Sequence, residues 1–193
     1  MYHIKDDQRS IRSSEMLYDG LARLMHEKLF DSISVTDLVR EAQVGRATFY
    51  RNFDEIEDVL KLKCDQIFDG LMAYFFEYIQ TNVSQINRNY RLIKPLLRYF
   101  NDHSDIIELL IVANRLDMVA QALRRILAPF KSQFTSRFDI EDEYVDFGFE
   151  MRIGIITNVL VHWIKMGKKQ DPDELADRLG TMTEIMLTQK ELL

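Results

Sequence analysis

The sequence has few of the residues that interrupt helices or cross-link chains. Its 193 residues include one cysteine, three prolines and seven glycines. A single cysteine, Cys64, excludes an intrachain disulfide and cannot build a zinc site alone, so the chain is compatible with a reducing cytoplasm. The scarcity of proline and glycine argues against an all-β sandwich or barrel, because those folds need frequent turns.

Long apolar runs are also missing. The longest apolar stretch, 153–164, is interrupted by polar residues and falls short of the roughly 20 apolar residues that a membrane-spanning helix needs. Residues 1–7 do not contain the apolar segment of a secretion signal. The sequence therefore predicts a cytoplasmic protein that does not associate with a membrane.

Motifs of the common enzyme and metal sites are absent. The four histidines, His3, His26, His103 and His162, are scattered without the spacing of metal ligands. There is no glycine-rich nucleotide loop and no serine-hydrolase nucleophile motif. We expect no catalytic residues, no metal site and no cofactor.

What the sequence does have is helical periodicity over nearly its whole length, and its 47% hydrophobic residues suffice for a buried core. The pattern predicts an all-α fold, with an N-terminal three-helix domain at 1–53 and a C-terminal helical bundle at 54–193. The expected helices span 10–28, 35–42, 46–52, 55–81, 90–100, 105–112, 115–127 and 141–166, and a last helix is capped by Asp171.

Charge is distributed unevenly along the chain. The net charge is −6, yet residues 1–53 hold eight Lys or Arg and eight Asp or Glu, so the acidic excess lies entirely in 54–193. Residues 43–53 include two arginines and no acid. A neutral domain with a locally basic tip can bind DNA phosphates in spite of an acidic remainder.

Residues 34–53, SVTDLVREAQVGRATFYRNF, form the most informative segment. Two short helices joined by three residues are stable only when they pack on each other and on the preceding helix. The apolar positions allow this packing, and Ala42 is small enough for a close helix crossing; the set is Leu38, Ala42, Val44, Phe49 and Phe53. The other face of the second short helix then presents hydrogen-bonding side chains, namely Arg46, Thr48, Tyr50, Arg51 and Asn52. Such a helix fits the major groove, where arginine binds guanine, asparagine binds adenine, and threonine and tyrosine bind phosphates.

The same residues resemble the DNA-binding domain of the TetR/AcrR family of bacterial transcriptional regulators. The resemblance covers about the first 60 residues. It rests on Phe30, 33–38, 41–42, 44 and above all 46–53, a run close to the family's small-Thr-aromatic-Tyr-x-x-Phe recognition helix. It implies an all-α homodimer that binds a palindromic operator in double-stranded DNA through a helix-turn-helix. It also implies DNA contacts from Ser34, Thr36, Arg46, Ala47, Thr48, Tyr50, Arg51 and Asn52.

Three positions depart from the family pattern. Gln43 stands where the family commonly has a glycine in a left-handed conformation, and Gly45 stands where it commonly has a serine cap. Ile56 replaces a lysine that binds phosphate in the family, and acidic residues flank it. We expect weaker or differently placed backbone contacts, for which the basic residues Arg9 and Arg12 of the N-terminal arm compensate.

Residues 54–193 resemble the family only in the order of their helices, with Trp163 and 171–175 at the junction of the last two. Those two helices usually form the family's dimer interface, and the apolar stripes agree with it. The expected interface residues are Trp163, Leu175, Leu179, Met182 and Met186. Many aromatic residues predict a mostly apolar effector pocket, with the candidates Tyr99, His103, Arg115, Phe147, Met151, Asn158 and His162.

We therefore expect a repressor that a small-molecule effector releases from DNA or modulates, and several alternatives stay open. The short helical pair also suits an ordinary bundle with Tyr50 in its core, and the apolar stripes also suit intrachain packing. An activator of the same family and a helical adaptor controlled by a protein partner are further options. Salt-dependent binding to duplex DNA separates a regulator from an adaptor. A cofactor or bound lipid in the native mass would indicate a small helical enzyme or a lipid carrier.

Overall fold

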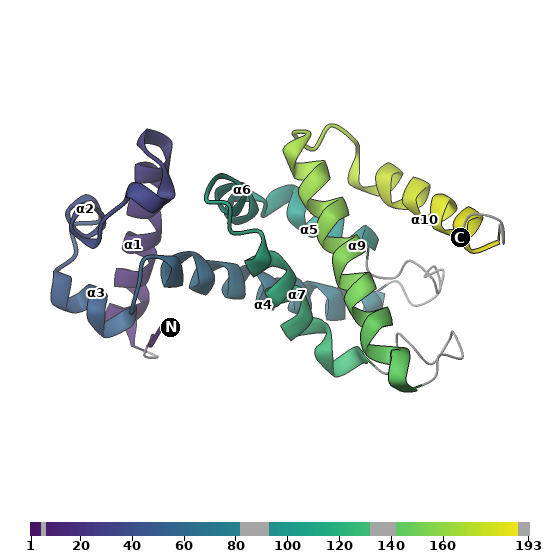
Figure 1. The fold of residues 1–193 in the computed structure, drawn as a ribbon, viewed down its shortest axis with the longest axis horizontal. Helices are drawn as coiled ribbons and strands as arrows, with labels where there is room; N and C mark the ends of the chain where they lie inside the picture. Colours follow the sequence, from purple (N-terminus) through teal and green to yellow (C-terminus); the bar gives the residue numbers. More distant parts are fainter. Residues whose placement is uncertain (5–6, 82–92, 132–141, 189–193) are drawn as a thin grey trace. The chain divides into compact units, whose positions relative to one another are not determined.

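The computed structural model describes residues 1–4, 7–81, 93–131 and 142–188; within the last range, side chains are described for 143–182. Over these residues the chain forms nine α-helices and no β-strand, which confirms the predicted all-α fold (Figure 1). The predicted beginning of one helix at 90–92 lies outside the described residues. Among the helices that are described, none is long and apolar enough to cross a membrane.

The chain divides into two compact units. The first comprises residues 1–67 and 105–122, and the second comprises 68–104 and 123–193. The first unit holds α1 (Gln8–Glu27), η1 (Phe30–Ser32), α2 (Val35–Glu41), α3 (Arg46–Asn52), α6 (Asp105–Val112) and the first parts of α4 (Glu57–Thr81) and α7 (Asp117–Leu127). The second holds the rest of α4 and α7, with α5 (Ile93–Asp102), η2 (Ala128–Phe130), η3 (Asp142–Tyr144), α9 (Val145–Lys165) and α10 (Pro172–Thr188). This division does not test the functional boundary after residue 53, which stays a prediction.

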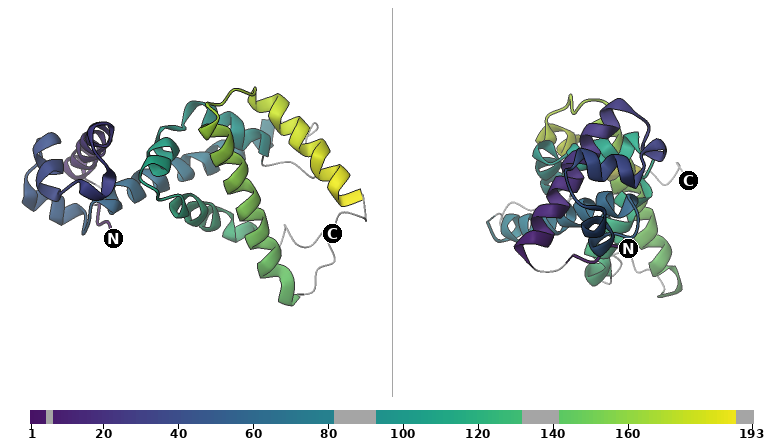
Figure 2. Two further views of the ribbon diagram at one scale, coloured as in Figure 1. Left: turned by 45° about the horizontal axis from the view of Figure 1, so that its top comes forward. Right: turned by 90° about the vertical axis from the view of Figure 1, so that its left-hand side faces the viewer.

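In the first unit, α1, α2 and α3 pack around one apolar core (Figures 1 and 2). Its fully buried side chains come from all three helices and the residue after α3: Leu17, Leu21, Leu38, Phe49 and Phe53. α1 and α2 cross closely, since a Cβ atom added to Gly20 would lie 3.0 Å from the Cβ of Ala42. The predicted packing of the two short helices is confirmed, including the small residue at the crossing.

The connections around α2 are set by local chemistry. Ser34 caps α2 with a capping box, because its Oγ accepts from the backbone N–H of Asp37 while the Asp37 carboxylate accepts from the N–H of Ser34. After α2 the chain reverses at Gln43, which has a φ of 54°. Position 43 thus needs the left-handed conformation that glycine adopts most easily, as the resemblance to the TetR/AcrR family implied.

In the second unit, α10 packs along α5 (Figure 2). The predicted cap of α10 is confirmed, because Asp171 accepts from the backbone N–H groups of Asp173 and Glu174. Arg98 of α5 donates two hydrogen bonds, of 2.6 and 2.5 Å, to the carboxylate of Asp173. This paired arrangement fixes the first turn of α10 against α5.

Candidate nucleic-acid interface

α3 has one buried side and one exposed side. Phe49 and Phe53 are both fully buried, and the centroids of their rings lie 5.9 Å apart. Arg46, Ala47 and Arg51 are exposed, Thr48 is half-buried and 57% of Tyr50 is exposed. The helix is therefore anchored in the core of the first unit by Phe49 and the following Phe53, while its polar side is exposed.

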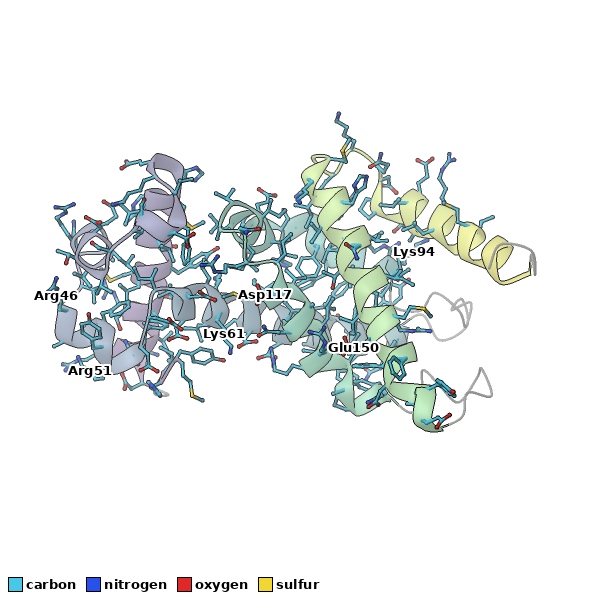
Figure 3. All side chains as sticks on the ribbon, in the orientation of Figure 1. Arg46, Arg51, Lys61, Lys94, Asp117 and Glu150 are labelled. Carbon is cyan, nitrogen blue, oxygen red and sulfur yellow. The ribbon has the colours of Figure 1, made fainter. Side chains whose placement is uncertain are left out.

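Two guanidinium groups project from this polar side. Figure 3 shows Arg46 and Arg51 on the side of α3 that faces away from α1. Arg46 donates a hydrogen bond to the hydroxyl of Thr36 in α2, and Arg51 donates one to the hydroxyl of Thr48 at 3.0 Å. A guanidinium carries five N–H donors, so each arginine keeps further donors for a ligand while one bond restricts its position.

Asn52 does not belong to this surface, and its predicted place on the exposed face is wrong. Its side chain is 2% exposed and points toward α1. There its Oδ1 accepts from the hydroxyl of Ser10 at 2.8 Å, and its Nδ2 donates to the hydroxyl of Ser13 at 3.0 Å. All three side chains are buried, so Asn52 joins α3 to α1 and cannot contact a base in this arrangement.

Ser34 and Thr36 are exposed at the start of α2, beside the polar side of α3. Asp37 lies next to them, but its charge is compensated. Lys28 donates to it at 2.8 Å and Ser34 adds further hydrogen bonds, which together hold the pKa of the Asp37 carboxyl well below its usual range. The hydroxyl groups of Ser34 and Thr36 thus lie in a neighbourhood without an uncompensated carboxylate from this helix.

Most of the acidic residues that flank Ile56 are bonded to other groups of the chain. Asp58 is 4% exposed and accepts from the backbone N–H groups of Asp54 and Glu55, so it fixes the connection that leads into α4. Glu57 pairs with Arg115 at 3.1 Å. Sequence alone suggested an acidic helix start, whereas three of the four carboxylates, those of Asp54, Glu57 and Asp58, have partners within the chain. Ile56 itself is half-buried and provides no cation for a phosphate.

The residues predicted for an effector pocket do not form a single group. The rings of Tyr99 and His103, both in the second unit, are in contact, with centroids 4.4 Å apart and planes inclined by 41°. Arg115 belongs to the first unit. On α9, Phe147 and Met151 are 72% and 67% exposed, and Asn158 and His162 are exposed as well. Among the described residues, the four candidates on α9 are therefore exposed side chains of that helix and do not line one cavity.

The residues predicted for a dimer interface also differ in their exposure. Trp163 is 2% exposed, and its indole N–H donates to the carbonyl of Gln170 at 3.1 Å, so it is part of its own unit's core. Its predicted interface role is wrong for this packing, because a buried indole presents no surface to a partner. Leu175 and Leu179 are half-buried, and Met182 is 54% exposed. The side chain of Met186 lies outside those described.

A stripe of large apolar side chains was not recognised as a unit from the sequence. It runs along α9 and the residue before it: Tyr144, Phe147, Met151 and Ile155, each more than half exposed. We call this set the α9 stripe. Its spacing of three and four residues was the available signal, since such positions share one face of a helix.

Comparison with known protein families agrees with this geometry. A family model described as "Bacterial regulatory proteins, tetR family" matches residues 17–61, and one described as "Transcriptional regulator C-terminal region" matches residues 90–184. The chain belongs to the TetR family of transcriptional regulators. The first match covers α2 and α3 together, so the helix-turn-helix is the family's DNA-binding module. Among curated proteins, the comparison finds no match.

The comparison with solved structures finds three bacterial proteins among its matches. Lin0861 from Listeria innocua is 23% identical, with a TM-score of 0.67 over 95% of this chain and 96% of that one. The repressor AlkX from a Dietzia species is 14% identical, with a TM-score of 0.47 over 91% and 95%. FadR from Bacillus halodurans, described as a fatty acid degradation regulator, is 20% identical, with a TM-score of 0.49 over 92% and 95%. At these identities, the first comparison shows a shared fold.

Proposed function

We propose that this chain is a homodimeric repressor that acts in the cytoplasm, binds a palindromic operator through α3 and leaves it when a small-molecule effector binds. One observation carries the DNA-binding part. Phe49 is fully buried behind α3, whereas Arg46, Tyr50 and Arg51 are exposed in front of it. A seven-residue helix with this division can enter the major groove without losing its own support.

The exposed side chains suit two kinds of DNA contact, with the edges of bases and with the phosphate backbone. Arg46 and Arg51 suit the two acceptors of guanine, and Ala47 leaves space for a thymine methyl group. The hydroxyl groups of Thr48 and Tyr50 suit phosphate oxygens, as do those of Ser34 and Thr36 at the start of α2. Phosphate contacts of this kind place the helix, and the base contacts supply sequence preference.

The α9 stripe supports the homodimer. Four large apolar side chains on one helix face, each more than half exposed, are costly to leave in water. We assign a second copy of this chain as the occupant, because a two-fold dimer presents two recognition helices to a palindrome. In such a dimer on successive major grooves, the two copies of α3 lie about 34–36 Å apart.

The effector is proposed from the aromatic content of the second unit, where Tyr99, His103 and Phe100 are in ring contact. An effector that binds more tightly to a dimer with misplaced recognition helices would shift the population away from the DNA-bound state. Because this coupling is reciprocal, operator DNA must weaken effector binding by the same factor.

The experiment begins with a duplex selected by the wild-type protein from a random pool. We expect Arg46→Ala and Arg51→Ala each to weaken binding to that duplex by about 1–3 kcal/mol, and Tyr50→Ala to weaken binding and reduce the salt dependence. Fluorescence anisotropy at several salt concentrations measures both quantities.

Arg178→Ala is the matched control, because Arg178 is an exposed arginine of α10 whose carboxylate partner is Glu174 in the same helix. It should bind the duplex as the wild type does. Selection of no duplex by the wild-type protein, or equal losses in Arg46→Ala and Arg178→Ala, would refute α3 as the DNA-binding helix.

A further inference from the structure

Residues 1–3 lie along the junction between α3 and α4, and we call them the N-terminal strap. Tyr2 forms an isolated antiparallel β-bridge with Phe53. The backbone N–H of His3 donates to the carbonyl of Asn52 at 2.7 Å, and the N–H of Asp54 donates to the carbonyl of Met1 at 3.2 Å. Two segments separated by about fifty positions in the sequence are thus joined by backbone hydrogen bonds on both sides of Phe53.

Side chains of the strap continue this contact. The hydroxyl of Tyr2 donates to the carboxylate of Asp65 in α4 at 3.0 Å. The ring nitrogen Nε2 of His3 lies 3.2 Å from the carboxylate of Asp54. Tyr2 is half-buried, so its ring is part of the junction rather than a loose end. The strap therefore contacts the last residue of α3, the connection to α4 and the body of α4.

The physical reason for such a strap lies in how α3 ends. The last four carbonyl groups of an α-helix have no partner within the helix. Many helices satisfy them with a left-handed glycine, but Phe53 follows α3 in an extended conformation with φ −142° and ψ 139°. The carbonyl of Asn52 receives its donor from His3 instead.

Asn52 consequently has hydrogen-bond partners in two segments, the strap and α1. Its carbonyl is bonded to the strap, and its side chain is bonded to Ser10 and Ser13 of α1. A seven-residue helix has little stability of its own, so its orientation depends on such external bonds. Arg51, the arginine next to residue 52, lies on the exposed side.

We infer that the N-terminal strap is a positioning element for DNA recognition: the N–H of His3 fixes the end of α3 and thereby the geometry of its exposed side chains. This inference rests on the proposed DNA-binding function. Base contacts depend on helix orientation, whereas binding to any duplex depends mainly on charge near phosphates. The strap should therefore affect binding to a selected duplex far more than binding to a scrambled one.

The test compares His3→Pro with His3→Ala in the whole 193-residue chain. Proline removes the N–H that caps Asn52 and is compatible with extended backbone at the residue before it, whereas alanine keeps the N–H and loses only the imidazole. We expect His3→Pro to weaken binding to the wild-type-selected duplex by about 3- to 10-fold, the range of one lost hydrogen bond. Its affinity for a scrambled duplex of equal length should stay within twofold of wild type, as should both affinities of His3→Ala.

Circular dichroism and sedimentation keep this test separate from a loss of folding, because both should match the wild type in His3→Pro. If that variant does not fold, Tyr2→Phe replaces it, since it removes only the hydroxyl bond to Asp65; the same selective loss is expected at smaller size. Equal binding of the variants and the wild type to the selected duplex overturns the inference, as does an equal loss on both duplexes. Failure of the wild type to select any duplex refutes the proposed function instead.

Discussion

Arg115 connects three segments of the first unit. It donates to Glu57 of α4 at 3.1 Å, to Asp31 of η1 at 2.9 Å and to the carbonyl of Ala113 at 3.2 Å. Its guanidinium also lies over the ring of Phe30, 5.3 Å from the centroid. The hydrogen bond to Glu57, followed by the charge of both carboxylates, raises the pKa of Arg115 above its ordinary value. Arg115, a residue predicted for an effector pocket, is thus a structural connection between η1, α4 and the turn before α7.

Replacing Arg115 should therefore reduce stability more than an ordinary surface change. We expect Arg115→Ala to lower the free energy of unfolding by about 1–3 kcal/mol, because charge-assisted hydrogen bonds to two carboxylates are lost. Arg115→Lys should recover less than half of that loss, since an ammonium group cannot reproduce a planar fork of donors. Urea unfolding measures both values.

Arg178→Ala is the control for this prediction as well, because an exposed ion pair within one helix contributes only about 0.3–0.5 kcal/mol to the free energy of unfolding. Full recovery by Arg115→Lys would show that only the charge matters.

Asp37 makes the first unit sensitive to acid. The hydrogen bond from Lys28, followed by those from Ser34, lowers the pKa of Asp37 in the folded state below its ordinary value. A carboxylate with a lowered pKa contributes stability above its unfolded-state pKa, and this contribution is lost as the pH falls through its folded-state pKa. The stability difference between wild type and Asp37→Asn should be largest near neutral pH and should shrink below about pH 4. Urea midpoints measured from pH 7 to pH 2.5 test this, and a difference that does not change with pH would contradict it.

The crossing of α1 and α2 depends on a glycine. A Cβ atom at position 20 would lie 3.0 Å from the Cβ of Ala42 and 3.1 Å from its Cα and backbone nitrogen. Backbone atoms cannot move aside as a flexible side chain can, so the two helices would have to separate.

Gly20→Ala should consequently lower the free energy of unfolding by about 1–2 kcal/mol, although alanine is the better helix former. Gly154→Ala in α9 is the matched control, because an added Cβ there meets nothing within 4 Å. That change should raise stability by about 0.5–1 kcal/mol. Thermal unfolding measures the change in stability of both variants. A gain in stability from Gly20→Ala would contradict the prediction, because it would show that the crossing of α1 and α2 can accommodate a methyl group.

The bounds of α3 and the cap of α10 could be predicted because their signals are local. Gln43, Gly45 and the Asp171–Pro172 start act through neighbouring residues in the chain. The place of Asn52 was also open to prediction. It comes three residues after Phe49, so helical geometry puts it about 60° from that buried ring. Grouping residues by polarity instead of by helical angle led to the wrong face.

Contacts between distant segments leave no such pattern. The pairing of Tyr2 with Phe53 and the bond between Arg115 and Asp31, 84 residues apart, follow from the tertiary packing and from no spacing in the sequence. The α9 stripe shows a further limit. Its periodicity predicts an apolar helix face but does not say whether the same chain or another one covers it, which is why Phe147 and Met151 were assigned to a pocket.

The assembly of the whole molecule can be tested on that stripe. The double variant Met151→Glu with Ile155→Glu should convert the dimer into a monomer of 22.9 kDa, because two charges would replace two exposed apolar side chains at the proposed interface. Sedimentation equilibrium measures the mass. Val112→Glu is the control, since Val112 is 60% exposed on α6 and outside the stripe. A wild-type monomer, or a double variant that stays dimeric, would contradict the assignment.

The burial of Asn52 limits how this regulator can be retargeted. A library designed to change operator preference would ordinarily randomise every polar position of α3. Position 52 should stay fixed, because a lysine or glutamate there would place a charge between Ser10 and Ser13 in the core. Variation confined to positions 46, 47, 50 and 51 should yield folded clones with new preferences, whereas clones altered at 52 should be lost as insoluble protein before any promoter is tested.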